Sequence, residues 1–189
     1  MAWLSPVKLA KAQHVLRQGG ILAYPTESVY GLGCDPFNRQ AVAALLELKH
    51  RPEHKGLILV AAHRKQVLAL WPHLREEQLQ RLETSTVMKP VTWLLPDTEG
   101  RIPPWLKGRH SQVAVRISAH PVVQRLCEGF GGALVSTSAN VSGFHAARTP
   151  LQVRQQFPRG LDFILTAELG GAARPSQIRD IDTGAIVRY

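Results

Sequence analysis

The alternation of helix-like and strand-like segments constrains the fold of this 189-residue chain more than any other feature. Apolar residues recur at helical spacing over residues 7–18 and 39–49. Each of these segments is followed by a short apolar run, at 21–25 and 57–62, which predicts a buried strand. Repeated alternation of this kind is typical of an α/β domain, in which helices connect the strands of one sheet.

The rest of the chain continues the pattern. Further strands are predicted at 91–95, 113–117, 133–136 and 162–166, and further helices from Pro121 to about 128 and from Thr149-Pro150 onward. Residues 176–189 predict an antiparallel hairpin around Asp182-Thr183-Gly184. We therefore expect one domain over residues 1–189, with a mixed parallel and antiparallel sheet flanked by helices. Residues 96–110 are rich in Gly and Pro and predict a mobile surface flap.

Charge and cysteine content narrow the class of protein. The 23 Lys and Arg against 14 Asp and Glu give a net charge of +9, which favours anionic partners such as nucleotides, nucleic acid or a membrane surface. No apolar stretch is long enough to predict a membrane span or an export signal. Cys34 and Cys127 are too few and too far apart for a disulfide scaffold, so we expect reduced thiols and a cytoplasmic protein.

One short motif suggests a metal site. His50 and His54, with Glu53 next to the second histidine, match the HxxEH pattern of one class of zinc peptidases. That chemistry needs both histidines on one helical face, and Pro52 between them disfavours a continuous helix. The sequence therefore predicts no metal site in this segment.

Three cations lie in the same region, where a predicted helix gives way to a strand. They are Lys49, Arg51 and Lys55. Arg presents a rigid fork of donors and Lys a mobile point charge, and this mixture suits phosphate or carboxylate groups. A solvated basic loop is the alternative, and this segment alone does not decide between the two.

Hydroxyl and amide side chains gather after the strand predicted at 133–136. They belong to Ser136, Thr137, Ser138, Asn140 and Ser142. At a strand end in an α/β sheet, short side chains let hydroxyl and backbone N–H groups approach phosphate oxygens closely. The spacing matches neither a Walker nor a Rossmann loop, nor a serine-nucleophile motif. A polar turn that caps a helix explains any one of these residues, but less well the five together.

A third polar segment follows the first predicted strand. Thr26 and Glu27 come directly after this strand, and Gly31 and Gly33 lie a few residues further on. Glycine lets the backbone approach a ligand closely, although an ordinary turn explains the same residues.

Together these segments resemble the YrdC family, most closely its short bacterial members. The matching stretches are YPTESVYGLGCD, LLELKHRPEHKGLILV, PVTWLLP, VAVRI, ALVSTSANVSG and RPSQIRDI. The resemblance implies a twisted open sheet around a basic concave cavity. It also implies the synthesis of threonylcarbamoyl-AMP from L-threonine, bicarbonate or CO2, and ATP, with diphosphate as the second product. ATP is then a substrate that brings Mg²⁺, and the product passes to the tRNA threonylcarbamoyl transferase machinery.

The resemblance also implies roles for individual residues. Lys49 and Arg51 are the implied catalytic cations. The implied ATP or phosphate ligands are Lys49, Arg51, Lys55, Ser136, Ser138, Asn140 and Arg179, and the implied threonine ligands are Thr26, Arg116 and Ser176. No general base is assigned.

One segment departs from the family pattern. Val87-Met88-Lys89 stands where the family carries Trp-Pro-Gly, so the resemblance does not predict the local turn. The net charge also leaves a different class of function open, a non-catalytic protein that binds double-stranded RNA or tRNA.

Overall fold

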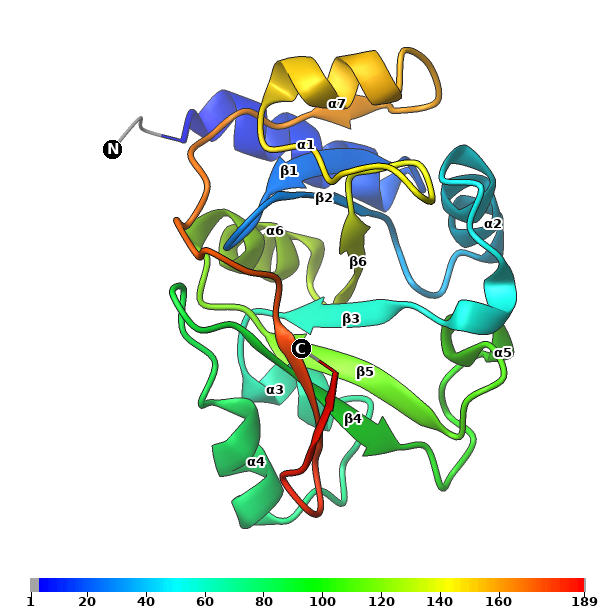
Figure 1. Cartoon of the computed structure of the whole chain (residues 1–189), viewed down its shortest axis with the longest axis vertical. Coiled ribbons are helices and arrows are strands. Elements are labelled where there is room, and N and C mark those ends of the chain that lie inside the picture. The colour runs from blue at the N-terminus through cyan, green and yellow to red at the C-terminus, as the bar shows by residue number, and fades with distance from the viewer. Residues whose placement is uncertain (1–3, 189) are drawn as a thin grey trace.

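The computed structural model describes residues 4–188, and helices lie between most of its successive strands (Figure 1). The helices are α1 (Pro6–Arg17), α2 (Arg39–Leu48), α3 (Arg64–Leu68), α4 (Glu76–Leu82), α5 (Pro104–Lys107), α6 (Pro121–Phe130) and α7 (Pro150–Gln156), with a short 3-10 helix, η1 (Glu53–Lys55). The strands are β1 (Leu22–Pro25), β2 (Tyr30–Gly33), β3 (Ile58–Ala61), β4 (Val91–Pro96), β5 (Gln112–Ile117), β6 (Leu134–Ser138), β7 (Phe163–Ile164), β8 (Gln177–Asp180) and β9 (Ile186–Arg188).

Within the described residues the nine strands form one open sheet, in the order β7-β1-β2-β6-β3-β5-β4-β8-β9. The pairs β7–β1, β3–β5 and β4–β8 are parallel, and the other neighbours are antiparallel. The mixed sheet predicted from the sequence is therefore confirmed, including the antiparallel hairpin of β8 and β9.

Helices pack on both faces of the sheet. On one face α1 and α6 contribute Leu16 and Leu126 to a core that includes Val60 of β3. On the other face α2 contributes Leu45 to a second core that includes Leu59, the neighbour of Val60 on the same strand. Successive side chains of a strand point to opposite faces, so β3 serves both cores. β3 is thus covered on both sides, which agrees with the continuous apolar run at 57–62.

The sequence pattern does not predict β2, α3 or α4. β2 reads Tyr-Gly-Leu-Gly, and its two glycines hide the alternation of apolar and polar residues that marks a strand. It forms because it pairs with β1 on one side and β6 on the other. The helices α3 and α4 are five and seven residues long, too short to show a clear helical period.

Residues 96–110 are packed against the body of the protein instead of forming a flap. They contain α5, and the side chains of Ile102 and Leu106 are 1% and 0% exposed. Lys107 Nζ lies 2.6 Å from Asp97 Oδ2, which ties the two ends of the segment together. The Gly and Pro content reflects tight turns here, and the buried side chains hold the segment in place.

The two cysteines lie in different cores. Cys34 belongs to the core under α2, and Cys127 to the core under α1 and α6, so the sheet separates them. Both are free, and burial raises the pKa of each thiol to about 12. Among the helices of residues 4–188, none combines the length and hydropathy needed to cross a bilayer.

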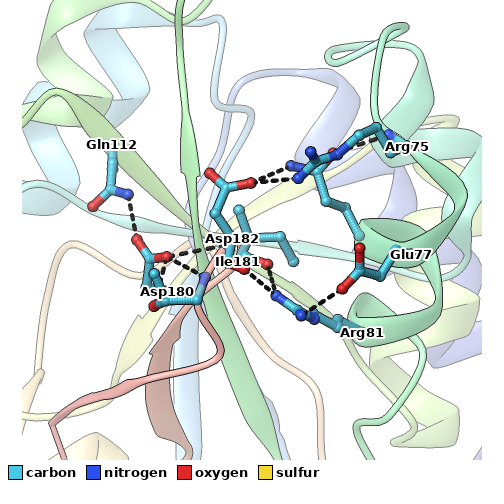
Figure 2. A network of polar contacts seen from close by, with 9 residues as sticks. Arg75, Glu77, Arg81, Gln112, Asp180, Ile181 and Asp182 are labelled. Carbon is cyan, nitrogen blue, oxygen red and sulfur yellow. Dashed lines mark hydrogen bonds and ion pairs between the residues drawn. The ribbon is translucent and has the colours of Figure 1, made fainter.

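A polar network fastens the C-terminal hairpin to α4 (Figure 2). Arg81 Nη1 donates to the carbonyl oxygens of Ile181 and Asp182, each at 2.6 Å, and Arg81 Nη2 lies 2.6 Å from Glu77 Oε1. Arg75 Nη2 lies 2.9 Å from Asp182 Oδ1. These contacts hold the turn that follows β8, and with it the strand that comes directly after Ser176.

We expect Arg81→Ala to lower the free energy of unfolding by about 1.5–3 kcal/mol, the range for hydrogen bonds made by a charged group. Arg64→Ala is the matched control, because its pair with Glu76 is exposed and pairs of that kind contribute about 0–1 kcal/mol. Urea denaturation of both variants measures the difference. Equal losses of stability would contradict a structural role for the Arg81 contacts.

Candidate functional site

A pocket of about 90 Å³ lies on the sheet face that also carries α1 and α6, because Ile58 packs against their core and Arg116 pairs with Val60 of that core. Its lining consists of Thr26, Ser28, Val29, Gly31, Ile58, Arg116, Ser136, Thr137, Ser138, Pro175 and Ser176. The strand register brings these residues together, since Ile58 pairs with Ser136 and Gly31 with Ser138. Hydroxyl groups and one guanidinium supply the polar surface, a composition suited to a small anionic or zwitterionic ligand.

Gly31 gives the pocket its space. A Cβ on this residue would lie 3.0 Å from Thr26 Cγ2 and 3.5 Å from Ser136 Oγ, inside the lining. Glycine is required at position 33 for a different reason, because a Cβ on Gly33 would lie 2.4 Å from the carbonyl oxygen of Val135. Gly31 therefore permits close approach of a ligand, whereas Gly33 permits close packing of β2 against β6.

Hydrogen bonds fix two of the polar side chains that line the pocket. Thr26 Oγ1 donates to the carbonyl oxygen of Val29 at 2.7 Å, within the loop between β1 and β2. Ser176 Oγ lies 2.8 Å from Thr92 Oγ1 of β4, so the segment before β8 is held at the pocket. Arg116 of β5 is 8% exposed, and its Nη1 lies 3.6 Å from Oε2 of the buried Glu27. These residues come from distant parts of the chain.

Lys49 lies behind the pocket wall, at the C-terminal end of α2. It is 2% exposed, and its Nζ donates to the carbonyl oxygens of Ser138 and Asn140, the latter at 2.7 Å. The N–H of Ser142 donates back to the carbonyl oxygen of Lys49 at 2.9 Å. Burial and the nearby charge of Arg51 lower the pKa of Lys49 to about 7. Lys49 thus ties α2 to the polar turn that follows β6.

The polar turn itself is ordered by Asn140. Ser138 Oγ donates to Asn140 Oδ1 at 2.6 Å, and Asn140 Nδ2 donates to the carbonyl oxygens of Val141 and Phe144 at 3.0 and 2.9 Å. The Ser138 side chain is exposed at the pocket, whereas the Asn140 amide is used within the turn.

Arg51 and Lys55 lie in the connection between α2 and β3. Arg51 Nη2 donates to the carbonyl oxygen of Gly56 at 2.8 Å, and Lys55 is exposed on η1. His50 and His54 share no helix, since α2 ends at Leu48 and η1 begins at Glu53. In residues 4–188 no three His, Cys, Asp or Glu side chains are grouped so that they could hold a metal ion.

Arg179 faces away from the pocket. In the sheet it pairs with Trp93, and Trp93 pairs with Val115. The side chains of Trp93 and Val115 belong to the core under α2, on the sheet face opposite to the pocket. Arg116, one residue along β5, points to the pocket face because side chains alternate along a strand. The structure therefore does not bring Arg179 to the other predicted ligands, although the family resemblance implies a role for it there.

The predicted residues fall into three groups. Those that line one pocket are Thr26, Arg116, Ser136, Ser138 and Ser176. Lys49 and Asn140 do not line the pocket but contact Ser138, which does. Arg51, Lys55 and Arg179 also lie outside the pocket lining. Ser28 was not predicted, although it lies two residues after Thr26 in the same stretch. Ser118, which contacts Glu27, belongs to no motif in the sequence.

The segment Val87-Met88-Lys89, which departs from the family pattern, lies beside the pocket. A Cβ on Gly170 would lie 2.5 Å from Val87 Cγ1, so Val87 packs directly over this glycine. The N–H of Gly170 donates to the carbonyl oxygen of Thr26 at 3.0 Å. Val87 therefore supports the backbone that carries Thr26.

Comparison with known proteins places this geometry in a family. The model of the Sua5/YciO/YrdC family, described as telomere recombination, matches residues 14–189. A protein of Saccharophagus degradans named threonylcarbamoyl-AMP synthase is 50% identical over 186 residues, 98% of this chain and 96% of its own length. A protein of Methylococcus capsulatus with the same name is 49% identical over 193 residues, and the match covers 100% of both chains.

A solved structure shares the fold. The structure of P. abyssi Sua5 complexed with L-threonine superposes with a TM-score of 0.82 at 29% identity, covering 93% of this chain and 51% of that chain. This chain therefore spans about half the length of the P. abyssi protein. With a family model that matches nearly the whole sequence and relatives about half identical over their full length, the chain is a member of the Sua5/YciO/YrdC family.

Proposed function

We propose that this protein synthesises threonylcarbamoyl-AMP from L-threonine, bicarbonate or CO2, and ATP, and releases diphosphate. The observation that carries the proposal is the near 50% identity, over almost the full length of both chains, to proteins named for this reaction. The pocket supports it, because Thr26, Arg116 and Ser176, the threonine ligands implied by the family resemblance, line one cavity.

Threonine binds in the pocket. Its carboxylate pairs with the Arg116 guanidinium, a charge-assisted contact in a site that water screens little. The hydroxyl groups of Thr26 and Ser176 lie in the same lining and can bond its polar groups. The P. abyssi relative, 29% identical, has L-threonine bound in a closely similar fold.

ATP binds next to the threonine, at the exposed edge of the pocket that the turn from Ser136 to Asn140 forms. In the reaction a carbamate oxygen on the threonine amine attacks the α-phosphorus of ATP, a P–O bond forms, and the bond to diphosphate breaks. Two anions meet in this step, so the main requirements are positive potential and alignment. Lys49 and Arg51 supply the potential, with Lys55 as a further cation. Mg²⁺ enters with ATP and neutralises phosphate charge.

The product serves tRNA modification. Threonylcarbamoyl-AMP carries an activated acyl group, which a cytoplasmic transferase places on the adenosine next to the tRNA anticodon. Direct contact with tRNA is supported by the net charge of +9 and by exposed cations at Arg148, Arg154 and Arg159. A protein that binds RNA without catalysis would share this surface but would not convert the substrates.

ATP binding should be coupled to proton uptake at Lys49. The pKa of Lys49 is lowered to about 7, so above that pH much of the amine is neutral in the free protein. An approaching triphosphate favours the ammonium form and raises the pKa. Uptake should therefore be small near pH 6 and rise as the pH passes about 7 and approaches 8.

Calorimetric titration of ATP in two buffers of different ionisation enthalpy measures this uptake. Lys49→Met, which cannot be protonated, should remove it. Equal uptake by the wild-type protein and the variant would show that another group takes up the proton.

The proposed activity is tested by product analysis. The protein is incubated with L-threonine, bicarbonate and ATP, and threonylcarbamoyl-AMP is sought by liquid chromatography and mass spectrometry. L-Valine in place of L-threonine is the control, because it keeps the shape of the side chain but lacks the hydroxyl group. Absence of the adenylate with threonine would overturn the proposal.

A further inference from the structure

A chain of buried polar groups leads from the start of α6 to the pocket. The N–H of His120 donates to Ser118 Oγ at 3.2 Å, and the Ser118 hydroxyl donates to Glu27 Oε1 at 2.6 Å. The other carboxylate oxygen, Glu27 Oε2, lies 3.6 Å from Nη1 of Arg116. Three successive contacts thus connect the beginning of a helix to the guanidinium that lines the pocket.

Burial makes this series of polar contacts energetically important. Glu27 is 1% exposed and Ser118 is 0% exposed, so little water screens the pair that Glu27 forms with Arg116. Within residues 4–188, Glu27 is the one carboxylate that pairs with this guanidinium, and Arg116 Nε has no hydrogen-bond partner. The ion pair with Glu27 therefore holds the guanidinium at the pocket that Arg116 lines.

Glu27 is fixed at its backbone as well as at its carboxylate. Ala172 N donates to the carbonyl oxygen of Glu27 at 2.8 Å. A Cβ on Gly170 would lie 3.0 Å from Glu27 Cα, so this part of the chain packs tightly against it. The carboxylate is held by Ser118 at one oxygen and by Arg116 at the other.

His120 connects the beginning of α6 to the segment that contains Glu168. Its Nδ1 accepts from the N–H of Val122 at 3.3 Å, so Nε2 carries the hydrogen and donates to the carbonyl oxygen of Glu168 at 3.2 Å. Burial lowers the pKa of His120, which favours the neutral ring that these two contacts require. The segment at 118–120 is therefore held to the same strap, residues 168–172, that fixes the backbone of Glu27.

We propose that Glu27 and Ser118 are positioning residues that hold the Arg116 guanidinium ready for the carboxylate of the amino-acid substrate. This inference rests on the proposed function, since that function supplies the anion. A guanidinium that is already fixed loses less conformational freedom on binding, so preorganisation increases affinity. Neither residue takes part in bond making; both act through Arg116.

The test is a double-mutant cycle on threonine affinity. Glu27→Gln keeps the side-chain volume and an acceptor for Ser118 but removes the charge that holds Arg116. We expect it to weaken threonine binding about tenfold or more in the wild-type background. In the Arg116→Gln background the same change should have an effect of about twofold or less, because there is no guanidinium left to position. Glu128→Gln, an exposed acid on α6, is the matched control.

A merely structural role gives a different result. It would weaken threonine binding equally in both backgrounds and would change the KM for ATP together with the KM for threonine. Either result, or a folded Glu27→Gln variant with wild-type threonine affinity, would overturn the proposal.

Ser118→Ala decides the question if Glu27→Gln does not fold. It keeps both charges, frees the carboxylate and removes the acceptor of the His120 N–H. Threonine affinity should fall about threefold or more, while Ser111→Ala, at an exposed residue, leaves it unchanged. A folded Ser118→Ala variant with unchanged affinity would overturn the proposal.

Urea unfolding of the same variants separates this inference from the proposed function. If the wild-type protein binds no threonine, the proposed function fails. Coupling between Glu27 and Arg116 in the free energy of unfolding would then still support the positioning contact, and its absence would refute it.

Discussion

Replacing Lys49 with alanine should lower the turnover of threonylcarbamoyl-AMP formation about a hundredfold or more, the effect typical of removing an electrostatic contact to transition-state charge. The Lys49 side chain is buried behind Ser138, beside the proposed phosphate site, where bound ATP favours its charged form. The substitution also leaves the carbonyl oxygens of Ser138 and Asn140 without their donor, which costs about 1–3 kcal/mol for each buried group that stays unpaired. Rate and stability should therefore both fall.

The matched control is Lys65→Ala, an exposed lysine on α3 that is remote from the turn in sequence. Circular dichroism establishes that both variants are folded, and steady-state kinetics give kcat for each. A folded Lys49→Ala protein with wild-type kcat would remove the cation from the mechanism, whatever its effect on stability.

Replacing Gly31 with valine should weaken threonine binding by about ten- to a hundredfold while leaving the fold intact. The new side chain enters the pocket, since even a Cβ would lie 3.0 Å from Thr26 Cγ2. Overfilling a packed site costs about 1–3 kcal/mol, and each 1.4 kcal/mol is a factor of ten in affinity. Gly31 lies in β2 and has no positive φ, so valine suits the backbone there.

Calorimetric titration with L-threonine measures this effect. Gly31→Ala should give an intermediate loss, and Gly132→Val is the control, because a Cβ at Gly132 meets only the Phe130 ring at 3.9 Å. Wild-type threonine affinity in a folded Gly31→Val protein would show that the amino acid binds elsewhere.

The apolar strands and the mixed sheet could be predicted because their signals are local. Runs such as 57–62 and 113–117 carry enough apolar residues to predict buried strands by themselves. β2 could not be predicted in the same way, since the reason for its glycines lies in distant segments. A Cβ on Gly33 would meet Tyr24 and Val135, and a Cβ on Gly31 would meet Thr26 and Ser136. Packing between strands, which a local pattern does not contain, decides that β2 forms.

The composition of the site could be predicted in part, but its geometry could not. Motifs identify Thr26 and Arg116, because they recur in a recognisable order. They do not show that Lys49 contacts a carbonyl 89 residues away, or that Ser118 contacts Glu27 across 91 residues. Arg179 illustrates a further limit, since only the register with Trp93 reveals which face of the sheet it occupies.

Threonine-dependent release of diphosphate from ATP distinguishes a threonylcarbamoyl-AMP synthase from a protein that only binds RNA. We expect diphosphate to form only when L-threonine, bicarbonate and ATP are all present, in equal amount to threonylcarbamoyl-AMP, and to fall about a hundredfold with Lys49→Ala. Diphosphate release that does not depend on threonine, or none at all from a folded protein that still binds tRNA, would contradict the enzyme and favour a protein that only binds RNA.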